Sequence, residues 1–413
     1  MKEYYNQKTA WIFPFLLVLY EIPNYLSTDM FLPALPEITI NLSTLPHISQ
    51  QTIGIWFLGG ACFQLLLGPL SDHFGRRPVL LIGAFCFVLA SLGCALAPNI
   101  QILLLTRFIQ GCSVGVIGTA GYATIHELYD QVKAIQVLAI MLSINVLAPA
   151  LGPLAGSLVL LVLSWRWIFV ILMLWALVIG LLLWCFMPET NPKFYLNKSD
   201  QNNLNLNHEV HEKAISVAQL LKNYCSLFLN PKFMLNNLIF CFAFLGLIAW
   251  LSSGPFLVEQ NYGSQSFYFA IFQILIFGSL ILGSLLVKIL VTKMGHARLI
   301  NLGLSSIFLG GCLGFLFPLF YPTFLFGIVI SLMILSFGVA LSFSSIHRIA
   351  IESCTEPMGA RMAVFTTLIS LSGFLGTLVV SLTYSENLVR FGFLLFVVSF
   401  LAIFTRLIVT RIK

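Results

Sequence analysis

Long apolar runs alternate with short polar segments along the whole chain. Each run approaches the roughly 20 apolar residues that a helix needs to cross a bilayer, and none shows the strict alternation of a barrel strand. Because backbone polar groups in lipid must be satisfied within their own segment, the pattern predicts an all-α integral membrane fold of twelve transmembrane helices. The predicted spans are Trp11–Met30, Thr52–Leu70, Val79–Ala97, Ile102–Ile125, Ala134–Leu161, Trp167–Met187, Met234–Val258, Ser266–Val291, Leu299–Phe317, Thr323–Arg348, Arg361–Thr383 and Val389–Thr410.

A polar stretch from Glu189 to Lys232 interrupts the series after the sixth span. Its centre is rich in asparagine, which indicates a flexible linker. The order predicts a six-helix bundle over residues 1–190, a cytoplasmic linker over 191–232 and a second six-helix bundle over 233–413. A faint repeat supports a duplicated transporter architecture, because Gly75–Gly83 and Gly295–Gly303 each place two glycines eight residues apart at the start of a span.

The composition excludes a water-soluble globular protein. Of the 413 residues, 59% are hydrophobic and only 9% are charged, whereas soluble domains carry about 25% charged residues. Lysines and arginines are concentrated at the termini and in every second loop, which lie on one side of the membrane. The loops on the other side carry only Arg166 and Arg390. Since cytoplasmic loops are enriched in lysine and arginine, we expect both termini to be cytoplasmic and no nucleic-acid partner.

Acidic residues inside the first span need a specific reason. A charge at the centre of a spanning helix costs about 2.5–3.5 kcal/mol on insertion scales. Glu21, Tyr25 and Asp29 are four residues apart, so they share one helix face, which we expect to face the interior of the bundle. For Asp29, near the end of the span, solvation at the membrane surface is an alternative. The same acidic residues favour a retained first span over a cleaved signal peptide.

Two of the arginines within or at the end of predicted spans are candidate functional residues. Arg107 is near the start of the fourth span, on the side that otherwise avoids positive charge, with Gln110 and Gly111 on the adjoining turns. We expect it to point inward near the level of Asp29, with snorkelling to the membrane surface as the alternative. Arg348 ends the tenth span, where snorkelling is favoured and a place at the cavity edge is a further candidate role.

Small residues recur every fourth position in the fifth span. Ala148, Gly152 and Gly156 form a seam for close helix packing, and Pro149 and Pro153 remove backbone donors and should bend the helix. The fourth span has a similar series at Gly111, Gly115 and Gly118. These features predict helices that slide or rock, with Pro149, Gly152, Pro153 and Gly156 as a conformational hinge.

The loop after the second span reads Gly-Pro-Leu-Ser-Asp-His-Phe-Gly-Arg-Arg-Pro from Gly68 to Pro78. Gly75 can adopt a left-handed turn, and Asp72 can pair with arginines or cap a helix end. The nine cysteines form no C-x-x-C pair and the seven histidines no H-x-x-x-H pair. We therefore expect no metal site and no cofactor.

These motifs resemble those of a known family. The Gly68–Pro78 loop is similar to the signature loop of the major facilitator superfamily, and Arg107-x-x-Gln110-Gly111 resembles the fourth-span motif of its proton-coupled members. Gly152-Pro153 resembles the antiporter motif of the drug:proton antiporters. The resemblance is dense over residues 11–190 and extends to Met187-Pro-Glu-Thr190, which closes the first half.

The resemblance implies roles for individual residues. Glu21 and Asp29 would titrate protons and recognise cations, Arg107 would link their protonation to helix movement, and Tyr122 would line the pocket beside Tyr25. Asp72 with Gly75, Arg76 and Arg77 would gate the cytoplasmic side. Gln110, Glu127 and Arg348 are further candidates.

The resulting functional hypothesis is a secondary transporter of the inner membrane that exports amphipathic drugs or toxic compounds in exchange for protons. An exporter or importer of one metabolite or siderophore on the same fold is the alternative. An enzyme is disfavoured, because the chain has no H-E-x-x-H and no nucleotide-binding loop. The expected partners are a small substrate, protons and lipid, and we expect a monomer.

Overall fold

The structure is a computed structural model and describes residues 12–190, 217–263, 266–383 and 387–411. Within these residues every regular element is a helix, and short turns and irregular segments connect the helices. The first half consists of α1 (Ile12–Asp29), η1 (Leu32–Ala34), α2 (Leu35–Asn41), α3 (Pro46–Phe74), α4 (Arg76–Leu96), α5 (Ile100–Val116), the π-helical turn η2 (Ile117–Gly121), α6 (Tyr122–Leu128), α7 (Gln131–Leu160) and α8 (Trp165–Phe186).

The second half begins with a short helix and continues with longer ones. It consists of α10 (Val217–Leu229), α11 (Pro231–Tyr262), α12 (Ser266–Phe320), α13 (Leu325–Glu352), α14 (Met358–Leu382) and α15 (Leu388–Arg411). Polar side chains mark several helix starts. Asn99 accepts a hydrogen bond from the Ile102 N–H, Asp130 from the Lys133 N–H and Asn230 from the Phe233 N–H, and such caps satisfy donors that the helix itself leaves unpaired.

The twelve predicted spans are confirmed. Nine helices in the described part of the chain are long and apolar enough to cross a membrane. One of these, α12, is two helices joined at Gly295, whose φ of 76° is not helical. The remaining two are α1 and α7, whose segment Leu147–Leu160 is apolar.

The glycines of the sequence repeat occupy equivalent structural positions in the two halves. Gly75 and Gly295 have positive φ values of 102° and 76° and break the chain between the second and third span of their half. Gly83 lies against Val116 of α5, and Gly303 lies against Gly338 and Ser342 of α13. The third and fourth spans therefore meet at an equivalent glycine in both halves, as a duplicated architecture requires.

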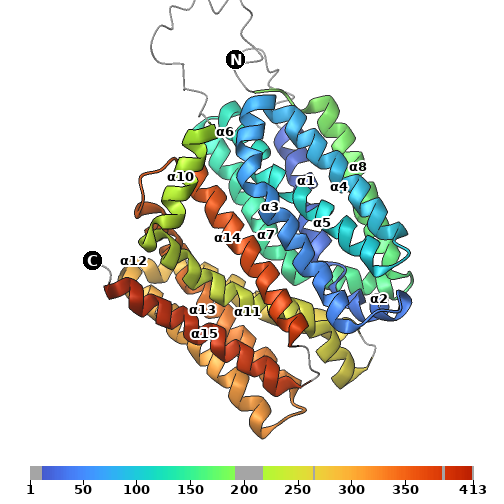
Figure 1. The fold of residues 1–413 in the computed structure, drawn as a ribbon, viewed down its shortest axis with the longest axis vertical. Coiled ribbons are helices and arrows are strands. Elements are labelled where there is room, and N and C mark those ends of the chain that lie inside the picture. Colours follow the sequence, from blue (N-terminus) through green and yellow to red (C-terminus); the bar gives the residue numbers. More distant parts are fainter. Residues whose placement is uncertain (1–11, 191–216, 264–265, 384–386, 412–413) are drawn as a thin grey trace, which may run out of the picture.

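The two halves meet along two pairs of helices. The helix α14 runs beside α3 (Figure 1), and α12 packs against α7. We call the end of the bundle that contains η1 and α2 the α2 side, and the opposite end, with residues 187–190 and α10, the linker side. On the α2 side, Gln51 donates to Ser381 at 3.1 Å, and Ser381 donates to the backbone oxygen of His47 at 2.8 Å.

The hydrophobic cores show that the halves are packed together mainly on the α2 side. One core joins the second half to first-half residues from the α2 side, such as Met30, Leu35 and Trp165. On the linker side the first half has its own core, built around Leu17, Phe87 and Leu183, and it contains no second-half residue among those described. Tyr224 of α10 bridges the halves there, donating to the Leu65 backbone oxygen at 2.9 Å.

The expectation of a flexible segment up to Lys232 is wrong for its last part. Residues 217–229 form α10, because Leu220, Tyr224 and Leu227 recur at helical spacing and pack against the linker-side end of the second half. Residues 191–216 lie outside the described part, so the predicted boundaries at 190 and 232 stay a prediction.

Candidate functional site

Glu21 lies inside the first half, near the middle of α1. Its side chain is 1% exposed. The hydroxyl of Tyr122 donates a hydrogen bond to Glu21 Oε1 at 2.8 Å, whereas the buried Oε2 has no hydrogen-bond partner. One oxygen of this carboxyl group is therefore available to a proton or a ligand. Tyr25, one turn further along α1, is half-buried.

Tyr122 owes its position to an irregular turn that the sequence did not predict. The π-helical turn Ile117–Gly121 separates α5 from α6 directly before Tyr122. A π turn holds one more residue than an α turn and so rotates every later side chain about the helix axis. The glycines at 115, 118 and 121 are the sequence signal that accompanies this turn.

Asp29, at the end of α1, is 4% exposed, so the alternative of a solvated surface residue is wrong. Its position is defined by the small-residue seam of α7. A Cβ atom added to Gly152 would lie 2.6 Å from Asp29 Cβ, and one added to Gly156 would overlap the backbone oxygen of Met30. The two glycines thus allow α7 to contact the chain at Asp29 itself.

Arg107 is fully buried between α1 and α3. Its Nη1 donates to the backbone oxygen of Ser27 at 2.8 Å and to Gln110 Oε1 at 2.5 Å, and its Nε donates to the backbone oxygen of Thr52 at 3.3 Å. The guanidinium carbon lies 4.3 Å from the ring centre of Phe31. The snorkelling alternative is wrong for this arginine.

Among the described residues, no acidic side chain lies within ion-pair distance of Arg107, although Asp29 is close enough to interact with it electrostatically. The described ion pairs do not include Arg107, Asp29 or Glu21, and the Arg107 Nη2 atom is buried without a hydrogen-bond partner. Backbone carbonyl oxygens and aromatic rings stabilise the cation instead. Gln110 joins the cluster to α4, since its Nε2 donates to Ser91 Oγ at 2.8 Å.

On the linker side, α3, α4 and α6 meet where Gly75 separates α3 from α4. Arg76 forms ion pairs with Asp72 at 2.5 Å and with Glu127 at 3.1 Å. Thr190 donates a short hydrogen bond to Glu127 Oε2. Glu127, a further candidate for coupling, therefore lies with the gate residues rather than with Glu21. Arg77 Nη2 donates to the backbone oxygen of Trp184 at 2.5 Å.

Glu189 completes this network and was not among the predicted gate residues. Its Oε1 accepts from the Arg76 N–H and its Oε2 from the Arg77 N–H, each at 3.0 Å, so the carboxylate caps the first turn of α4. A Cβ atom on Gly75 would lie 2.5 Å from Glu189 Oε2, which explains the glycine there together with its positive φ. The segment Met187-Pro-Glu-Thr190 was the available signal.

The remaining candidates lie apart from these clusters. Arg348 is 64% exposed and pairs with Glu352 one turn later at 2.7 Å, in agreement with the favoured snorkelling account. The seam of the fourth span is only partly correct. Gly111 and Gly115 face α3 at Trp56 and Gln64, whereas Gly118 has no neighbour within 4 Å of an added Cβ.

The Gly152 contact leads to a first testable prediction. We expect Gly152→Ala to displace Asp29 and α1, because overpacking a close contact typically costs about 1–3 kcal/mol. The thermal unfolding midpoint should fall and transport should weaken. Gly180→Ala is the matched control, because its added Cβ would lie 3.8 Å from Ala84 Cβ, an ordinary contact. Equal midpoints and equal transport in the two variants would contradict the assigned contact.

The fold and the site together define a multi-pass membrane protein of the transporter type, with buried charges inside one of two six-helix halves. The sequence profile described as Major Facilitator Superfamily matches residues 17–377. The chain belongs to the major facilitator superfamily.

Curated relatives cover most of the chain. It is 28% identical over 369 residues to "Multidrug resistance protein MdtM" of Salmonella typhimurium (strain LT2), which covers 86% of this chain and 83% of that protein. It is 30% identical over 352 residues to "Multidrug transporter MdfA" of Edwardsiella ictaluri, with coverage of 85% and 82%.

Solved structures confirm the fold. The structure superimposes on a D-xylose-proton symporter with a TM-score of 0.74 at 17% identity, covering 97% of this chain and 98% of that one. It matches the partially occluded inward-open conformation of the xylose transporter XylE from E. coli with a TM-score of 0.71 at 15% identity, covering 98% of each chain. At these identities, the likeness concerns the fold alone.

Proposed function

We propose that this protein is a proton-coupled antiporter of the inner membrane that exports amphipathic drugs or toxic compounds. One observation carries the proposal: Glu21 and Asp29 are buried in the same half as Arg107, and neither forms an ion pair with it. The names of the curated relatives support a multidrug substrate class over a single metabolite or siderophore. The protein would transport its substrate without an enzymatic step. It would act as a monomer, because one chain supplies both halves.

Protons and substrate would compete for the same carboxyl groups. A carboxyl group shielded from water is favoured in its neutral form, and it ionises when water or a cation reaches it. Glu21 offers one unpartnered oxygen beside the Tyr122 hydroxyl, so a cationic substrate or a proton can occupy it. Proton release on one side and substrate release on the other then follow from which side is open.

Arg107 would convert protonation into helix movement. It holds α1 and α3 through the backbone oxygens of Ser27 and Thr52, and its Nη2 atom is unpartnered. When Asp29 ionises, the cation gains a new attraction within the same apolar interior, where such attraction is strong. The hydrogen bonds from Arg107 to α1 and α3 would then weaken. The seam at Gly152 and Gly156, with Pro149 and Pro153, would serve as the hinge for the helix movement.

The linker side is assigned to the cytoplasm by its lysine and arginine content. In this orientation the structure represents a state packed on the external side, and alternating access requires a second state packed on the linker side. Asp72, Gly75, Arg76 and Arg77 would form the gate of that second state, and Glu189 and Glu127 would hold the loop in shape.

The gate assignment predicts a conformational defect for Asp72→Asn. The variant should favour the state that is packed on the α2 side, because the contact that closes the linker side is weakened. Transport should fall while substrate still binds. The measurement is the rate at which an impermeant maleimide, added on the α2 side, reacts with the Ser381→Cys variant. The reaction of the chain without this added cysteine is subtracted. The rate should drop in the Asp72→Asn variant, and an unchanged rate would show that Asp72 does not gate.

The transport proposal is tested with everted membrane vesicles. A cationic dye should accumulate against its gradient when the vesicle lumen is made acidic, because protons then leave as the dye enters, and accumulation should stop when the proton gradient is collapsed. Vesicles without the protein are the control. Accumulation that persists after the collapse would contradict proton coupling, and no accumulation of cationic, neutral or zwitterionic compounds would contradict drug export.

A further inference from the structure

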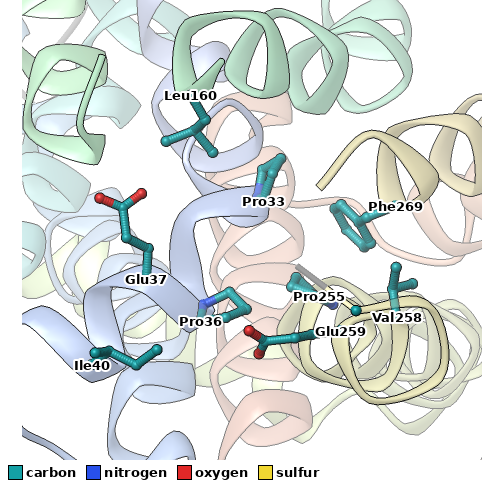
Figure 2. A pocket seen from close by; sticks show the side chains of 10 residues that line it. Pro33, Pro36, Glu37, Ile40, Leu160, Pro255, Val258, Glu259 and Phe269 are labelled. Atoms are coloured by element: carbon teal, nitrogen blue, oxygen red, sulfur yellow. The ribbon is translucent and has the colours of Figure 1, made fainter. Parts of the chain in front are cut away.

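A cavity of about 280 Å³ lies between the two halves on the α2 side, and neither Glu21 nor Asp29 lines it. It is built from η1, α2 and the end of α7 in the first half, and from α11 and α12 in the second (Figure 2). Its walls are mostly apolar, with three prolines, Leu160 and Phe269. Two carboxylates also line it, Glu37 from the first half and Glu259 from the second.

Glu259 is the less well satisfied of the two acids. Its side chain is half-buried and extends from α11 toward Pro36 of the first half (Figure 2). Among the residues that the structure describes, it forms neither a side-chain hydrogen bond nor an ion pair. An ionised group in partly apolar surroundings is unfavourable unless a partner compensates the lost hydration. The cavity beside it has room for such a partner.

Glu37 has more favourable interactions than Glu259, but its carboxylate can still interact with a further cation. Its carboxylate accepts a hydrogen bond from the backbone N–H of Trp165 and lies near the positive charge of Arg166. Burial nevertheless raises the pKa of Glu37, against the opposing effects of these two groups. A second cation in the cavity would therefore stabilise both carboxylates at once. Phe269 adds an aromatic ring, the kind of surface that recognises quaternary ammonium groups.

We propose that this cavity is a second binding site, separate from the buried carboxylates of α1, and that it takes a small organic ammonium ion. Its volume is below the roughly 300–1,000 Å³ of pockets for drug-sized ligands, which favours a compact cation over a large drug. Because both halves line the cavity, an occupant contacts both and stabilises the state in which the α2 side is packed. The proposal does not depend on the direction or the coupling of transport.

The test is equilibrium binding of radiolabelled tetraethylammonium to the full chain carrying Glu21→Gln and Asp29→Asn, which removes the α1 carboxylates. Adding Glu259→Gln should weaken binding about tenfold or more, as expected for a lost charge partner. Glu37→Gln should have a smaller effect, because Trp165 and Arg166 already engage that carboxylate. Glu356→Gln, on the linker side, is the matched control and should leave binding unchanged.

A second measurement uses a chain that is otherwise unaltered. Ile40 lines the cavity and is 74% exposed, so Ile40→Cys should react with an impermeant maleimide. Tetraethylammonium should slow this reaction, and adding Glu259→Gln should abolish the protection. Equal affinity with and without Glu259→Gln, or labelling that tetraethylammonium does not slow, would overturn the proposal. Protection by Ca²⁺ but not by tetraethylammonium would also overturn it, because the site would then be one for an inorganic cation.

Discussion

Replacing Arg107 by alanine is expected to abolish transport while leaving insertion into the membrane intact. The side chain is fully buried and joins α5 to the backbone oxygens of α1 and α3. Its removal takes the side-chain donor away from those two carbonyl oxygens and from Gln110 Oε1, and a buried acceptor that is left unpaired costs about 1–3 kcal/mol. It also removes the only cation that we place in the coupling cluster.

Arg107→Lys separates the charge from the geometry. Lysine keeps the positive charge but loses the planar fork of five donors, so it cannot reach Ser27, Thr52 and Gln110 together. We expect transport to fall about a hundredfold, equivalent to ~2.7 kcal/mol. The measurement is dye uptake into everted vesicles, normalised to folded protein by thermal unfolding. Full activity of the lysine variant would show that charge alone matters, and full activity of the alanine variant would remove Arg107 from the mechanism.

The second large effect is expected for the acidic pair of α1. Glu21→Gln should lose cationic substrates and keep some neutral ones, because Asp29 remains to exchange protons. The double variant Glu21→Gln, Asp29→Asn should stop uphill export of every substrate, whatever its charge. The pair lies in one apolar interior, where two neighbouring negative charges are unfavourable together, so one group is expected to carry the proton while the other engages the cation.

This prediction is measured with one cationic and one neutral substrate in everted vesicles under an imposed proton gradient. Gln and Asn keep the size of the two side chains, so packing against Tyr122 and Gly152 should be little changed. A matched variant, Glu356→Gln, removes a carboxylate outside both proposed sites and should transport normally. Accumulation of the neutral substrate by the double variant would place the coupling carboxyl groups elsewhere.

The sequence predicted the parts of the site that are expensive in lipid. Glu21, Asp29 and Arg107 interrupt apolar runs, and only an interior position compensates their charges, so their burial could be inferred without coordinates. The twelve spans followed from run length for the same reason. What these residues do remains a prediction, because burial alone does not show proton exchange.

The sequence could not predict contacts that depend on how distant helices meet. The Glu189 carboxylate caps α4 more than 100 positions earlier, and no local pattern reveals that pairing. The π turn before Tyr122 leaves only a weak glycine signal. Glu259 directly follows the predicted seventh span, and only the packing of α11 against η1 and α2 places it in a cavity.

The most direct test of the central claim is substrate-driven proton release from the purified protein in detergent. Adding a cationic substrate to the wild-type chain in weakly buffered solution should release protons, because substrate and proton compete for the carboxyl groups of α1. The Glu21→Gln, Asp29→Asn variant should release none at the same substrate concentration. Equal proton release by the wild-type chain and the double variant would contradict the account.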